Sequence, residues 1–89
     1  MRAVVTVIGK DTVGILAKVS ALCQEYNANI IDVSQTVMQD LFAMIMLVEV
    51  GKLSSEYAAF VEKMKALGTA QNLSIHVMHE DLFNSMHKI

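Results

Sequence analysis

One apolar stretch in the middle of the chain limits the possible folds most strongly. Residues 41–50 (LFAMIMLVEV) are apolar at nearly every position. The stretch is too short to cross a bilayer as a helix, and it is typical of a strand that is covered on both faces. We therefore expect a strand over residues 41–50 whose two faces are both covered.

The residues before this stretch predict a strand, a helix and a second strand. Residues 2–9 are rich in β-branched side chains and close on a glycine, which indicates a strand. Apolar residues then recur at spacings of three and four, which predicts an amphipathic helix: Ile15, Leu16, Val19, Leu22, Cys23 and Tyr26. Asp11 or Thr12 can cap the start of this helix, and Asn27 can take the left-handed conformation that ends it. Residues 29–38 alternate between apolar and polar, which predicts a half-exposed strand, and a tight turn at Gln39 and Asp40 follows.

The residues after the central stretch predict a helix, a strand and a tail helix. Ser54 or Ser55 can cap the helix, whose apolar stripe comprises Tyr57, Phe60, Met64 and Leu67. Either Gly68 or Asn72 can end it. Residues 73–78 alternate as a strand, and Asp81 can cap a short helix over about residues 81–89.

The element order β-α-β-β-α-β predicts the fold class. We expect an α+β protein with a ferredoxin-like βαββαβ sandwich: a four-stranded antiparallel sheet with helices on one face and a short C-terminal tail helix. Residues 1–89 would form one domain, with a core over about residues 2–78. This topology places the first and third strands at the sheet centre, where the apolar stretch 41–50 belongs.

The sheet face without helices predicts self-association. The chain is 54% hydrophobic, which is more apolar surface than a domain of this size can bury alone. Alternate residues of the third strand can meet a partner, either the set Phe42, Met44, Met46 and Val48 or the set Ala43, Ile45 and Leu47. A homodimer or higher homo-oligomer is the simplest solution, and the tail helix can pack across that interface or on its own subunit.

Composition argues against several classes of function. The net charge is −2 with scattered basic residues, which is not typical of a nucleic-acid-binding protein. The single cysteine, Cys23, excludes an internal disulfide and a Cys-x-x-Cys motif. No combination of nucleophile and base and no set of metal ligands can be named, so we expect no enzyme, no metal and no cofactor. Nothing indicates a membrane span or a secretory signal, which predicts a cytoplasmic protein.

The loop 9–14 (GKDTVG) carries the chemistry that most suggests a ligand. It joins a central strand to a helix, whose first backbone N–H groups favour a carboxylate or phosphate. Asp11 beside them suits a zwitterion, whose ammonium group would meet the aspartate. The alternative is that Asp11 only caps the helix and the glycines only serve the turn. Asn27 and Asn29, which flank the start of the second strand, offer donors and acceptors together, although both can serve the turn alone.

These residues also resemble a known family. Asp11-Thr12-Val13-Gly14-Ile15-Leu16, followed by Asn29-Ile30, resembles the signature of the ACT domain, a small regulatory module that often senses amino acids. The resemblance covers residues 2 to about 78. Residues 79–89 (HEDLFNSMHKI) are similar to the tail of small standalone bacterial and archaeal ACT proteins of unassigned function.

The resemblance implies a ligand at a dimer interface. By position, Asp11 and Asn29 would meet the ligand, with Thr12 and the backbone of Val13, Gly14 and Ile15 around it. Gly9 stands where some serine sensors have histidine and Val13 where many members have proline, so serine specificity does not follow. We expect a regulatory module that senses an amino acid or a similar metabolite. The alternative is an oligomerisation or adaptor protein that acts on a separate protein partner without a ligand.

Overall fold

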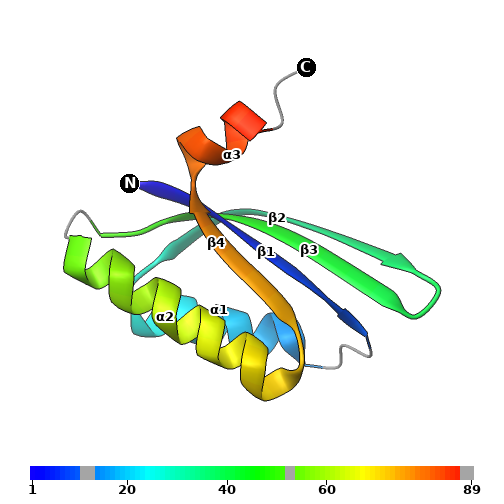
Figure 1. The fold of residues 1–89 in the computed structure, drawn as a ribbon. Coiled ribbons are helices and arrows are strands. Elements are labelled where there is room, and N and C mark those ends of the chain that lie inside the picture. The colour runs from blue at the N-terminus through cyan, green and yellow to red at the C-terminus, as the bar shows by residue number, and fades with distance from the viewer. Residues whose placement is uncertain (11–13, 52–53, 87–89) are drawn as a thin grey trace.

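The fold is a four-stranded sheet with two helices on one face and a short helix on the other (Figure 1). A computed structural model describes residues 1–10, 14–51 and 54–86. The elements are β1 (Arg2–Lys10), α1 (Ile15–Glu25), β2 (Asn29–Met38), β3 (Leu41–Glu49), α2 (Ser54–Gln71), β4 (Ser74–His79) and α3 (Glu80–Met86). This order confirms the predicted α+β architecture.

The sheet is antiparallel with the strand order β2-β3-β1-β4. β1 and β3 occupy the centre, as the sequence predicts, and β2 and β4 form the edges. The two-residue turn at Gln39 and Asp40 joins β2 to β3, and Gln39 takes a positive φ of 56° there. A bulge at Ile31 interrupts the pairing of β2 with β3. The β2–β3 hairpin extends beyond the ends of the helices (Figure 1).

The core lies between the sheet and the helices α1 and α2. β3 contributes Phe42, Met44, Met46 and Val48, whose side chains are all buried. Phe60 and Met64 of α2 pack against this layer, and the ring of Phe60 meets that of Tyr26 edge to face at 6.0 Å. These apolar side chains are shielded from water in the folded chain. Their burial is the main contribution that stabilises the fold.

The opposite face of β3 is only partly covered within one chain. Its side chains are Leu41, Ala43, Ile45 and Leu47, and Ile45 is 45% exposed. The expectation that residues 41–50 are covered on both faces is therefore not met by a single chain. The reason is that α3 lies over the side of the sheet that β1 and β4 form (Figure 1).

The helix ends correct two predicted caps. α1 has Gly14 at its N-cap in place of the predicted Asp11 or Thr12, which lie outside the described residues. The chain enters α1 in the left-handed conformation, which glycine adopts at no steric cost. Asn27 ends α1 at a φ of 54°, as predicted, and Asn72 rather than Gly68 ends α2 at a φ of 57°. The alternative end at Gly68 is wrong because the helix continues to Gln71.

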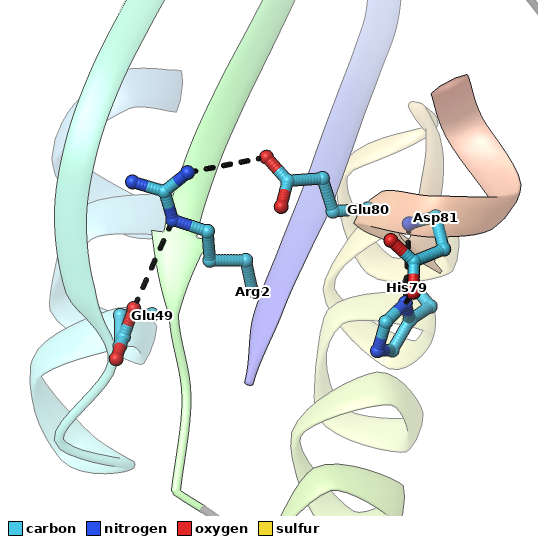
Figure 2. Close-up of polar contacts among 5 residues, drawn as sticks. All are labelled: Arg2, Glu49, His79, Glu80 and Asp81. Atoms are coloured by element: carbon cyan, nitrogen blue, oxygen red, sulfur yellow. Dashed lines mark hydrogen bonds and ion pairs between the residues drawn. The ribbon is translucent and has the colours of Figure 1, made fainter.

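α3 packs on its own subunit and begins one residue earlier than predicted. The backbone N–H of Asp81 donates to Nδ1 of His79 at 3.1 Å, so Asp81 lies within the first turn and His79 supplies the capping acceptor. Figure 2 shows Arg2 between two carboxylates, with Glu80 at 3.4 Å and Glu49 at 3.9 Å. The pair with Glu80 joins α3 to β1, and the pair with Glu49 joins β1 to β3.

Candidate functional site

The predicted site residues occupy two separate places in the structure. Gly14 and Ile15 start α1, directly beyond the loop that follows β1, and Asn29 is the first residue of β2. Asp11, Thr12 and Val13 lie outside the described residues. Ile15 is buried in the core, so only its backbone is available to a ligand.

The strand register places Gly14 and Asn29 at opposite ends of the sheet. Lys10 pairs with Leu41, which pairs with Met38, so the loop toward Gly14 leaves from the hairpin end. Asn29 pairs with Glu49, which pairs with Arg2 at the start of β1. A strand of this length spans about 25 Å at the usual rise per residue. One chain therefore does not bring these two site residues together.

The Gly14 end offers backbone donors at the start of α1. Gly14 has a φ of 83°, and a Cβ built on it would meet no atom within 4 Å. The glycine is thus required by backbone conformation and leaves open space beside the helix start. The first turn of α1 contains no acidic residue and no side-chain cap. Its first N–H groups are available to an anionic group.

The Asn29 end contains an open pocket of about 430 Å³ at the junction of α1 and β2. Asn29 lies on its wall, and the other lining residues are Ser20, Cys23, Gln24, Asn27, Ala28 and Ile30. Sequence reasoning identified Asn27 and Asn29 but missed Ser20 and Gln24. Their signal was present, because Ser20, Gln24 and Asn27 follow the spacing of one helix face.

Cys23 lies at the base of this pocket as an uncharged thiol. It is 1% exposed, and burial raises its pKa from 9.0 to about 11. Desolvation disfavours the thiolate, which is the reactive form. The thiol therefore acts as a small apolar packing group at neutral pH.

The histidines of the described residues have partners other than a metal. His76 Nε2 lies 3.1 Å from the hydroxyl of Ser74, and His79 Nδ1 lies 3.6 Å from the carboxylate of Asp81 (Figure 2). Among residues 1–10, 14–51 and 54–86, no group of three or more His, Cys, Asp or Glu side chains is placed to hold a metal ion. No helix within these ranges has both the length and the apolar character needed to cross a membrane.

Comparison with known proteins identifies the family. The family model of the ACT domain matches residues 2–79. The chain belongs to the ACT-domain family. A UPF0237 protein of Methanosarcina mazei is 47% identical over 88 residues, which cover 99% of this chain and 96% of the relative. A UPF0237 protein of Clostridium perfringens is 45% identical over the full length of both chains.

A solved structure shows the same fold. An ACT domain protein from Streptococcus pneumoniae superposes with a TM-score of 0.80 at 34% sequence identity, covering 93% of each chain. This ACT domain is thus a UPF0237-type protein of the kind found in bacteria and archaea. ACT domains are regulatory modules that bind small molecules.

Proposed function

We propose that this ACT domain senses an amino acid or similar small metabolite in a composite site between two copies of the chain. The observation that carries the proposal is the separation of Gly14 and Asn29 within one chain. Two residues at opposite ends of a sheet can contribute to one site when a second subunit is rotated by a two-fold axis.

The free edge of β2 supports this arrangement. β2 is long and largely exposed, and its apolar side chains include Val37 at 67% and Met38 at 62% exposure. An edge strand of this kind offers unpaired backbone groups to another chain. Antiparallel pairing of two β2 edges would set Asn29 of one subunit at the hairpin end of the other. That end also contains the other subunit's Lys10 and Gly14.

The chemistry of the two ends is complementary to a zwitterion. Asp11 would hold the ammonium group, while Thr12 and the backbone N–H groups of Val13, Gly14 and Ile15 would surround the carboxylate. Asn29 of the second subunit would meet the remaining polar group through its amide, which both donates and accepts. Ligand binding would then favour the dimer, which is how the signal would reach a separate protein.

Thermal melting against the twenty amino acids tests this proposal first. A ligand at about 100 times its Kd stabilises the folded state by about 2.7 kcal/mol, which raises the Tm of a domain this small by about 10 °C or more. We expect one amino acid or a small group to produce this shift. Asp11→Ala and Asn29→Ala should each abolish it, while the control variants Asp81→Ala and Gln35→Ala should keep it.

Mixing the two inactive variants tests whether the site is composite. A heterodimer of Asp11→Ala and Asn29→Ala chains contains one site in which both Asp11 and Asn29 are intact. Mixed and re-equilibrated subunits should therefore recover ligand binding at about one quarter of the wild-type site number if the chains exchange at random. No recovery, although mixed dimers form, would contradict the composite site.

A second candidate function is that of an adaptor that binds a protein partner without a ligand. The observation that favours it is the open sheet face, where Ile8 and Ile45 are each 45% exposed, and α3, where Leu82 and Met86 are exposed. Exposed apolar patches of this kind mark interaction surfaces. Under this function, the melting panel would give no shift, and Ile45→Lys would abolish binding of a purified partner while the chain stays folded.

A further inference from the structure

The pocket at the α1–β2 junction has a chemical character that points to one class of ligand group. This inference rests on the proposed function, because Asn29 belongs both to the composite site and to this pocket. The pocket of about 430 Å³ can hold a small side chain, and it lies at the end of the sheet where β2 begins.

None of the residues that line the pocket carries a charge at neutral pH. Its polar groups are the hydroxyl of Ser20 and the amides of Gln24, Asn27 and Asn29. No side-chain hydrogen bond or ion pair among the described residues engages any of these four groups. They present donors and acceptors together, which complements a group that also does both.

The backbone around the pocket disfavours a negative charge. The pocket lies at the C-terminal end of α1, where the helix dipole is negative. The carbonyls of Cys23 and Gln24 accept from the N–H groups of Ala28 and Asn27 at 2.7 Å and 3.1 Å, so the turn is closed and fixed. A carboxylate here would meet a negative helix end and no cationic side chain in the lining. An ammonium group would find no carboxylate there to neutralise it.

We propose that this pocket is the specificity subsite of the composite site and that it receives an uncharged polar group, a carboxamide or a hydroxyl. Cys23 and Ala28 are buried, and the four polar side chains of the lining offer both donors and acceptors to such a group. The ligands of this class are amino acids with uncharged polar side chains. Their charged ends would remain with the loop of the second subunit.

Pairs of nearly isosteric amino acids test this subsite. The probes are L-asparagine against L-aspartate and L-glutamine against L-glutamate, together with L-serine, L-threonine, L-lysine and L-leucine. We expect binding of at least one uncharged polar amino acid. If that amino acid is asparagine or glutamine, it should bind about tenfold or more tightly than its acidic counterpart, because a tenfold ratio corresponds to one hydrogen bond of about 1.4 kcal/mol. If it is serine or threonine, it should bind tighter than every charged probe by a similar factor.

Two variants separate the pocket from the rest of the site. Asn27→Gly removes the amide but keeps the positive φ of 54°, and Gln24→Ala keeps the helix. Each should reduce the preference for the uncharged ligand to about threefold or less while dimerisation persists. Gln35→Ala, an exposed change on β2 outside the pocket, is the matched control and should keep the full preference.

The outcomes distinguish failure of the subsite from failure of the whole site. A preference for aspartate, glutamate, lysine or leucine that depends on Asp11 and Asn29 would overturn the subsite and leave the composite site standing. A preference for the uncharged ligand that persists in both Gln24→Ala and Asn27→Gly would also overturn the subsite and leave the composite site standing. If none of the twenty amino acids changes the Tm, both the subsite and the proposed function are rejected.

Discussion

Gly14 shows how a single backbone conformation serves both the fold and the candidate site. Its φ of 83° turns the chain into α1, and a Cβ built on it would meet no atom of the described residues within 4 Å. A residue with a Cβ pays about 1–2 kcal/mol for the left-handed conformation, whereas asparagine adopts it more readily. The same glycine leaves room for a ligand at the helix start.

Gly14→Ala should lower the free energy of unfolding by about 1–2 kcal/mol, measured by urea denaturation at fixed protein concentration. The cause would be backbone strain alone, since a Cβ would meet no atom within 4 Å. Gly14→Asn is the matched control, and its free energy of unfolding should fall by less. Equal falls in the two variants would show that lack of space for a side chain, and not the positive φ, makes glycine necessary at position 14.

Cys23 should make the fold sensitive to alkaline pH. Its pKa is raised by burial from 9.0 to about 11, so the folded state holds the thiol proton more tightly than the unfolded state. The resulting stability is complete below pH 9 and is lost as the pH rises through 11. The raised pKa of Cys23 thus contributes about 2–3 kcal/mol to the free energy of unfolding below pH 9. Burial also raises the pKa of Tyr57, which adds to the loss in the same direction.

The measurement is the free energy of unfolding between pH 8 and pH 11, under reducing conditions. Cys23→Ala should have a shallower decline than wild type, with the remaining slope due in part to Tyr57. Parallel curves for the two proteins would be incompatible with a buried thiol whose pKa is raised.

Sequence patterns predicted the local residue roles better than the long-range ones. Asn27 was predictable because left-handed positions at helix ends favour asparagine. The turn at Gln39 and Asp40 was predictable because these two polar residues separate two strand patterns. The N-cap of α1 was not predictable. Asp11 and Thr12 are residue types that cap helices well, and the sequence alone does not show that α1 starts after Gly14. Ser20 and Gln24 were missed because polar residues on a helix usually face solvent.

At the scale of elements, α2 and α3 are attached to the sheet in different ways. α2 contributes the buried Phe60 and Met64 and packs closely at Gly68, where a Cβ would lie 2.9 Å from the carbonyl of Leu73. α3 has no buried residue among its described side chains, and the ion pair that Glu80 forms with Arg2 of the sheet is exposed. Burial therefore stabilises α2 far more than α3.

Phe60→Ala should cost about 3–5 kcal/mol of unfolding free energy, whereas Arg2→Ala should cost less than about 1 kcal/mol. The first change removes a core ring and its contact with Tyr26, and the second removes ion pairs screened by water. Chemical denaturation gives both values, and circular dichroism checks that Phe60→Ala still folds. If Arg2→Ala proved as damaging as Phe60→Ala, α3 would be integral to the core.

The element order was predictable because most segments have a period of two or of three to four, and the one continuous apolar stretch, residues 41–50, has the length of a buried strand. The sequence did not predict which face of β3 the helices cover. An apolar sequence does not distinguish a face buried within the chain from one that is left for a partner. Only the structure assigns Phe42, Met44, Met46 and Val48 to the helices and leaves Ala43, Ile45 and Leu47 on the open face.

At the scale of the whole molecule, β2 is the edge through which we expect two chains to join. Ile31 and Val37 lie on this strand and are exposed in one chain. Lysine on an edge strand discourages pairing with another chain, because the added charges would have to enter the interface close to those of the other chain.

Ile31→Lys combined with Val37→Lys should weaken dimerisation by about tenfold or more, measured by sedimentation equilibrium. Ala58→Lys, an exposed change on α2, adds charge away from the edge and should leave the dimer unchanged. Dimers that persist in the double variant would place the interface on the open sheet face instead.

The separation of Gly14 from Asn29 has a consequence for how such a sensor would be tuned. A site assembled from two chains exists only in the paired fraction, so its apparent affinity depends on how much of the protein is present. A cell could then set the threshold of its response through expression level, with every binding residue unchanged. Dilution alone would erase the signal.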